Sequence, residues 1–276
     1  MNFVLPAPQM QRSHGVAAIS LGLHKGRARL LDLAQSGSAK VILPHQGAGM
    51  GAVPELVFFN TSGGLTGGDT LRYQITLGEG AQATATTQTA ERAYRSTAGV
   101  ARVVVKARVG ASGWLDWLPQ ETILFQSSAL HRSTRIDLGP DAGCLMVETI
   151  VLGRAAMGET VTDLCVQDRR EVWRQGRPVL IDPFALGDDR LALRPALLNG
   201  ARVVASIAFV TTGAEDALGP VRAVLDEPGV QAAASGWDGR LTLRLMAADG
   251  WPMRRQILRV LAVLRPGQAA PRVWQI

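Results

Sequence analysis

Apolar and polar residues alternate along much of this chain, which is the pattern of half-buried β-strands. The clearest example runs from Leu71 to Leu77, where every second residue is apolar and the residues between them are polar. Residues 100–109 and 130–138 alternate in the same way. A glycine-containing turn at 78–80 predicts a hairpin that joins the first of these strands to a second strand at 81–89. The pattern therefore predicts a mainly β protein.

Further strands and two late helices complete the expected fold. Strands are expected at 16–21, 28–33, 39–43, 144–152, 160–173, 178–181, 201–210 and 240–246. Apolar residues at helical spacing predict a helix over 215–227, and Pro252 suits the first turn of a second helix that ends at Pro266.

We expect a single domain over residues 1–276, in which residues 1–14 form a flexible arm. Its fold class is a large antiparallel or helical β assembly, a β-helix-like sandwich, with about two α-helices in the C-terminal third.

Composition and charge narrow the class of protein. The 276 residues carry a net charge of +6, yet the arginines are scattered and no basic tail typical of nucleic-acid binding occurs. The positive charge has two interpretations: a solvated arginine-rich surface, or a basic surface that meets an acidic protein partner. The chain has two cysteines and neither an apolar signal segment nor a membrane span, so we expect a cytoplasmic protein.

A glycine-rich stretch ending in Asp69 is the most distinctive motif. Two glycine pairs flank Leu65 and Thr66, which indicates positive φ angles or close approach to a neighbouring group. The pairs are Gly63, Gly64, Gly67 and Gly68. Asp69 stands where a phosphate loop needs lysine, and the glycines at 47–52 are interrupted by a proline rather than followed by a βαβ unit. Nucleotide binding is therefore disfavoured.

Glu148 is unusual because it lies in the middle of the apolar segment 144–152. A carboxylate there must find a partner, raise its pKa or serve a function. Arg154 is the candidate partner, and the structural and functional interpretations both remain open. Glu121 and Glu159 are further carboxylates that follow distinctive tryptophan-proline and glycine motifs.

Enzymatic and tight metal-binding chemistry find little support. The four histidines are isolated and no nucleophile motif is present. A hydrolase could use Asp69, Glu121, Glu148 and Glu159, but their spacing does not select that reaction. Carboxylates beside hydroxyl residues suit weak, reversible contact with a hydrated divalent cation, and no tightly bound cofactor is expected.

Four motifs, taken in order, resemble the UreD (UreH) family of urease accessory proteins. They are the glycine stretch ending at Asp69, Tyr94-Arg95-Ser96, Trp117-Leu118-Pro119-Gln120-Glu121, and Gly153-Arg154 with Gly158-Glu159. The resemblance implies a mainly β, non-catalytic maturation chaperone that forms a dimeric or larger accessory complex. With UreF and UreG it would bind the urease apoprotein and deliver nickel, held only transiently, through an internal channel.

The resemblance also assigns candidate channel residues. Asp69 and Glu148 are the first candidates for transient nickel contact, followed by Glu159 and Glu121. Glu91 departs from the small residue common in relatives, and its carboxylate could change the charge of the channel or pair with Arg92. Two alternatives remain: a scaffold without a metal path, and a carboxylate-dependent hydrolase.

Overall fold

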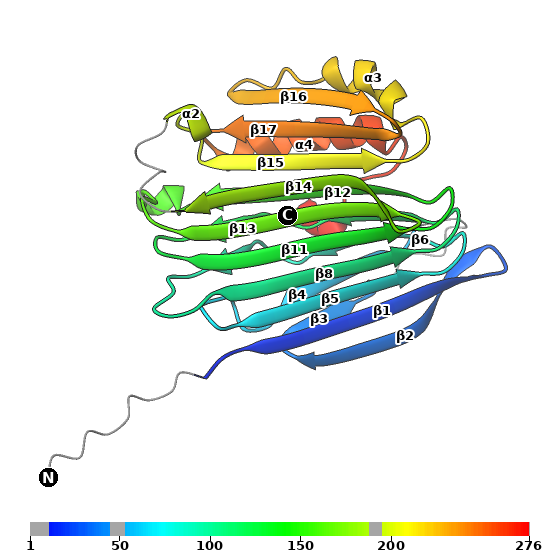
Figure 1. Cartoon of the computed structure of the whole chain (residues 1–276), viewed down its shortest axis with the longest axis horizontal. Coiled ribbons are helices and arrows are strands. Elements are labelled where there is room, and N and C mark those ends of the chain that lie inside the picture. Colours follow the sequence, from blue (N-terminus) through cyan, green and yellow to red (C-terminus); the bar gives the residue numbers. More distant parts are fainter. Residues whose placement is uncertain (1–10, 45–52, 188–194, 276) are drawn as a thin grey trace, which may run out of the picture.

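Two β-sheets face each other in the computed structural model, which describes residues 11–44, 53–187 and 195–275 (Figure 1). The front sheet runs in the order β14 (Arg177–Gly187), β13 (Cys165–Arg174), β11 (Ala129–Leu138), β8 (Ala101–Val109), β5 (Thr70–Leu77), β1 (His14–His24) and β2 (Arg27–Gly37). The back sheet runs in the order β16 (Val230–Trp237), β17 (Arg240–Ala247), β15 (Val203–Val210), β12 (Gly143–Leu152), β9 (Trp114–Leu118), β6 (Gln82–Thr87), β4 (Glu55–Asn60) and β3 (Ala39–Ile42).

The central strands form a β-helix-like stack. From β4 to β13 the chain passes alternately through the back and front sheets, and neighbouring strands within each sheet are parallel. Two short strands, β7 (Glu91–Ala93) and β10 (Thr122–Leu124), pair with each other, and β10 also pairs with β12. The expected mainly β, β-helix-like sandwich is confirmed.

The predicted hairpin around residues 78–80 is wrong. β5 and β6 do not pair; they lie in opposite sheets, because β5 is bound on both sides by the parallel strands β1 and β8. The short turn carries the chain across the sandwich instead of reversing it within one sheet. The alternation itself is confirmed, since Leu71, Tyr73, Ile75 and Leu77 are all buried.

The C-terminal helices differ in part from the prediction. The helix expected over 215–227 is a 3₁₀ turn at Ala214–Ala217 followed by the short α3 (Leu218–Arg222), in which Gly219 weakens helix propagation. The second expected helix is present as α4 (Gly250–Leu264), capped by the Asp249 carboxylate. The sequence pattern missed β16 and the short α2 (Pro195–Leu198).

Residues 13 and 14 are held more firmly than expected. Ser13 donates its backbone N–H to Asp69 Oδ1 over 2.8 Å, and His14 already belongs to β1. The predicted arm over residues 1–14 is therefore too long at its C-terminal end. Residues 1–10, and the glycine pattern at 47–52, lie outside the described part of the chain.

Hydrophobic residues fill two layers. One lies between the sheets, and the other lies where α4 covers the opposite face of the back sheet. Alternation along β12 serves both layers, because Leu145 and Val147 contact the helix layer while Cys144 and Met146 belong to the layer between the sheets. None of the helices in the described residues is long and apolar enough to cross a membrane.

A buried ion pair fixes the end of α4 to the back sheet. Arg265 Nε donates to Asp116 Oδ2 over 2.7 Å, and its Nη2 donates to Thr84 Oγ1 over 3.1 Å. Asp116 is fully buried and Arg265 is 5% exposed. Because a buried charge that loses its partner is strongly unfavourable, this pair holds the C-terminal end of α4 against the back sheet.

We expect Arg265→Met to lower the free energy of unfolding by about 3–5 kcal/mol, since it leaves the Asp116 carboxylate buried without its countercharge. Urea unfolding measures this change. The control is Arg240→Ala, which removes an ion pair to the largely exposed Asp238 and should change the same free energy by less than about 1 kcal/mol. Equal effects of the two substitutions would contradict the prediction.

Candidate functional site

The sequence motifs separated along the chain meet at one end of the sandwich, which we call the motif end. Leu65 forms a parallel bridge with Ala93, so the glycine stretch lies against β7. Tyr94 donates its hydroxyl to the Gly63 carbonyl over 3.2 Å. The backbone N–H of Glu91 donates to the Glu121 carbonyl over 3.0 Å, which brings in the third motif.

The glycines of the first motif are required by close packing. A Cβ on Gly64 would lie 2.3 Å from the Tyr94 ring, and a Cβ on Gly67 would lie 2.1 Å from Ser96 Oγ. The glycine motif therefore allows the turn to approach the Tyr94-Arg95-Ser96 segment closely, as the sequence indicated.

Asp69 holds this turn together. It is 5% exposed, and its two carboxylate oxygens accept the backbone N–H groups of Ser13 and Thr66, each over 2.8 Å. Thr66 in turn donates its hydroxyl to the Arg95 carbonyl over 2.9 Å. The carboxylate thus organises the backbone of the motif end.

Glu159 and Arg154 complete the motif end on the other side. Arg154 stacks on the Phe125 ring, 4.5 Å from its centroid, and Phe125 packs edge-on against Tyr94. Arg154 Nε donates to Glu159 Oε2 over 2.8 Å, and this hydrogen bond is the main reason that the pKa of Glu159 is lowered. Gly158 closes the intervening turn with a φ of 64°.

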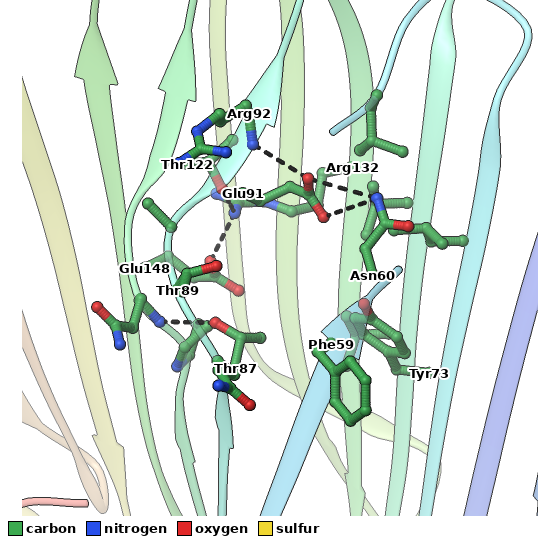
Figure 2. Close-up of a pocket in the computed structure, with 18 of the residues that line it drawn as sticks. Phe59, Asn60, Tyr73, Thr87, Thr89, Glu91, Arg92, Thr122, Arg132 and Glu148 are labelled. Carbon is green, nitrogen blue, oxygen red and sulfur yellow. Dashed lines mark hydrogen bonds and ion pairs between the residues drawn. The ribbon is translucent and has the colours of Figure 1, made fainter. Parts of the chain in front are cut away.

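A cavity of about 90 Å³ begins at the motif end and lies between the two sheets (Figure 2). We call it the inner cavity. Its polar lining comes from both sheets and from the short strands: Asn60, Tyr73, Glu91, Thr122, Arg132 and Glu148. Exposed Gln88 and Thr89 also line it, so the inner cavity reaches the surface beside β7.

Glu148 provides a buried carboxylate to the inner cavity. It is 2% exposed; Oε1 accepts hydrogen bonds from Trp117 Nε1 over 2.9 Å and from Thr134 Oγ1 over 3.1 Å. Oε2 lies 2.8 Å from Arg132 Nη1 but accepts no hydrogen bond of good geometry. Burial raises the pKa of Glu148 against the opposing effect of Arg132.

Arg132 is shared between two acids. Its Nε and Nη2 donate to the two oxygens of Asp168 over 3.0 and 2.7 Å, while Nη1 donates to Thr122 over 3.0 Å. Although burial opposes ionisation of Asp168, the Arg132 guanidinium lowers its pKa. Asp168 therefore takes the bidentate geometry and leaves Glu148 with the weaker contact.

A second, larger hollow also touches Glu148. This side pocket has a volume of about 430 Å³ and lies where α2 meets β15, β16 and β17. Its walls are mainly apolar, but Arg170, Ser206 and Arg244 also line it. Glu148 lines both the inner cavity and the side pocket, so one buried carboxylate stands between two hollows.

Glu91 stands where the inner cavity reaches the surface. Figure 2 shows its carboxylate directed at the Asn60 amide, 3.3 Å from Oε2 to Nδ2. The backbone N–H of Arg92, rather than its guanidinium, donates to Glu91 Oε1 over 3.0 Å. Burial is the largest cause of a pKa raised to about 7, and the negative charge of Asp69 adds to it.

Of the four carboxylates expected on a metal path, the structure places only Glu148 in the inner cavity. Asp69 is bound to backbone N–H groups, and Glu159 lies at the surface with Arg154. Glu121 lines a separate pocket beside α4. The described residues contain no group of three histidine, cysteine or acidic side chains that could hold a metal ion.

Arg132 and Asp168 were missed by the sequence analysis, and the predicted partner of Glu148 was wrong. Arg154 binds Glu159, whereas Arg132 binds Glu148. A usable signal existed: Arg132 occupies an inward position of an alternating strand, and it pairs in register with Asp168 on the next parallel strand.

Comparison with known proteins decides the family. The model of the UreD urease accessory protein family matches residues 13–275. The chain belongs to the UreD family. A urease accessory protein UreD from Cereibacter sphaeroides is 61% identical over 98% of both chains. The UreD of Paracoccus denitrificans is 54% identical over 97% of this chain and 94% of its own, and that of Rhizobium leguminosarum bv. trifolii is 41% identical over 96% of both.

Membership of the UreD family confirms the resemblance and sets the functional class. UreD proteins are accessory proteins for urease and not enzymes themselves. The carboxylate hydrolase is therefore set aside, in keeping with the dispersed positions of its four candidate acids. The motif end, which carries the UreD motifs, is also the end at which the inner cavity opens.

We expect Glu91→Gln to stabilise the protein at pH 8 and to have little effect at pH 5. The pKa of about 7 in the folded protein lies above the ordinary value of 4.5, so ionisation of Glu91 removes stability as the pH rises through this interval. The gain at pH 8 should be about 1–2 kcal/mol, less than the full pKa shift implies because the side chain is partly exposed.

Urea unfolding of both proteins at pH 5 and pH 8 measures this difference. The control is Glu79→Gln, which makes the same substitution at an exposed turn position outside the inner cavity and should change the unfolding free energy by less than about 0.5 kcal/mol. A Glu91→Gln effect that is independent of pH would refute a perturbed Glu91.

Proposed function

We propose that this protein is a urease maturation chaperone that binds the urease apoprotein together with UreF and UreG, in the cytoplasm, and passes nickel toward the urease active site. The observation that carries the nickel path is the position of Glu148, a buried carboxylate of a UreD-family chain that lines both the inner cavity and the side pocket. Nickel is the cargo of this process and not a resident cofactor.

The inner cavity has the chemistry of a weak cation path. Its polar lining offers carboxylate, amide and hydroxyl oxygens, which suit a hydrated divalent cation, and it also contains Arg92 and Arg132. Arg132 is held by Asp168 and Glu148, so its charge is largely neutralised. Since a conduit must release an ion as readily as it accepts one, few ligands at each point suit conduction better than a closed ligand set. Asn60 and Glu91 stand at the opening, and Glu148 stands at the junction with the side pocket.

The proposed path assigns different tasks to the expected acids. Glu148 would contact nickel directly. Asp69 would act through the turn that it holds and through its charge beside Glu91. Glu121 and Glu159 lie outside the lining of the inner cavity, so direct nickel contact by either requires a route other than this one.

A scaffold without a metal path is the second candidate, and the Arg132 contacts favour it. Arg132 joins Glu148 of the back sheet to Asp168 of the front sheet, as a purely structural brace would. On this view Glu148 contributes to stability and complex assembly, and nickel reaches urease by another way. The two candidates predict different results for the same substitution.

Glu148→Gln is expected to leave the complex with UreF, UreG and apo-urease intact but to lower urease activation at limiting nickel by about tenfold, because it removes the charge that attracts the cation while keeping the side-chain shape. Complex assembly is measured by size-exclusion chromatography. Activation is measured as nickel bound per urease active site and as urease activity after incubation with nickel and bicarbonate.

Glu148→Leu and the surface variant Glu79→Gln complete the experiment. Glu148→Leu should also lower activation, whereas Glu79→Gln should behave as the wild type. Loss of the complex with both Glu148 variants would favour the scaffold. Normal activation by an intact Glu148→Gln complex would exclude Glu148 from the nickel path.

A further inference from the structure

The outer face of the front sheet carries a group of cations that form no ion pair or hydrogen bond through their side chains within the described residues. We call this group the basic strip: Arg72 on β5 and Arg102, Lys106 and Arg108 on β8. All four are exposed. Figure 1 shows β5 and β8 side by side near the middle of the front sheet.

The strand register explains why these cations remain unpaired toward β5. Arg102, Lys106 and Arg108 lie opposite Thr70, Gln74 and Thr76, respectively. Arg72 lies opposite Val104. The outward positions of these two described strands therefore contain no carboxylate.

The next strands of the same face are arranged differently. Arg135 on β11 lies 2.7 Å from Asp137, and Arg169 on β13 pairs with Glu171. Asp137 is opposite Arg108 in register, but it accepts its hydrogen bonds from Arg135. Cations beside the basic strip are thus neutralised within the sheet, and those of the basic strip are not.

An unneutralised row of like charges on a flat sheet destabilises the free protein, because neighbouring charges of one sign repel each other. A partner that supplies carboxylates relieves this repulsion and is steered to the face as it approaches.

The chemistry of the face favours an acidic protein over a nucleic acid. Sites for single-stranded nucleic acids typically combine a basic groove with aromatic rings on which bases stack, and the outward positions of β5 and β8 in the described structure contain no aromatic ring. Trp173, farther along the same face on β13, is stacked with Arg135. Double-stranded nucleic acid needs no such rings and is therefore one of the probes below. The face that runs from β13 through β11, β8 and β5 to β1 covers roughly 500 Å² at about eight residues per strand, from strand spacings of about 4.8 Å and rises of about 3.3 Å. A flat protein surface can cover such an area.

We propose that the basic strip is a docking surface for an acidic face of the urease apoprotein. This inference rests on the proposed function, since urease is the protein that the names of the relatives connect with this family. Docking here leaves the motif end, where the inner cavity opens, available to other members of the complex.

The test compares two triple variants that remove the same charge. The first, the basic-strip variant, replaces Arg102, Lys106 and Arg108 with glutamine. The second, the turn variant, replaces Lys25, Arg27 and Arg177 with glutamine. These three residues are exposed at or beside the β1–β2 and β13–β14 turns. Each variant lowers the net charge from +6 to +3. Circular dichroism and thermal unfolding verify that both variants fold as the wild-type protein does.

The affinity for purified apo-urease is measured by surface plasmon resonance at several salt concentrations, with UreF, UreG and a double-stranded DNA fragment as separate probes. We expect the basic-strip variant to bind apo-urease about tenfold or more weakly and with a smaller salt dependence, because charged contacts are lost. The turn variant should stay within about twofold of the wild type, since it keeps those contacts.

Several outcomes would overturn the inference. Equal losses in both triple variants would show a general effect of net charge. A loss confined to UreF, UreG or DNA binding would place another partner on the basic strip. Unchanged apo-urease binding by a folded basic-strip variant, in a system where the wild type activates urease, would remove the docking surface and leave the proposed function standing. Failure of the wild type to activate urease would remove both.

Discussion

The interaction on which the structure most depends is the contact of Arg132 with two carboxylates between the sheets. Asp168 comes from the neighbouring front strand and Glu148 from the back sheet, so one guanidinium joins the two halves of the sandwich. Such charges are tolerated in a low-dielectric interior only when they are paired and hydrogen-bonded. Because Asp168 takes the bidentate contact, Glu148 is the acid whose charge is least compensated. The Glu148 carboxylate therefore belongs both to the ion-pair network that joins the two sheets and to the proposed nickel path.

Much of the strand content could be predicted from local alternation, but the pairing of the strands could not. The alternation along residues 71–77 shows which side chains face inward, whichever sheet the strand joins. The turn at 78–80 gives no such information, because a short turn can close a hairpin or carry the chain to the opposite sheet. β16 escaped prediction because its small residues, Ala232 to Gly236, lack a clear apolar period.

The site was predictable only where its chemistry conflicted with its local sequence. Glu148 was conspicuous because its neighbours are apolar, whereas its partner Arg132 required knowledge of which strands face each other. Asp69 was also conspicuous, and the structure shows it bound to two backbone N–H groups of the turn. The surroundings of Glu91 include Asn60 and Tyr73, which come from two other strands. Burial by distant segments leaves no mark in the nearby sequence.

The reversed strands at the borders of the front sheet have a consequence for self-association. A stack of parallel coils can in principle be extended indefinitely by further copies, as in fibrous assemblies. Here β2 and β14 run antiparallel to their neighbours, and the pairing of β1 with β2 is interrupted by a bulge near Leu21. The parallel coil repeat of the central strands therefore ends at β2 and β14, so a further copy could not continue the stack there in the same parallel register.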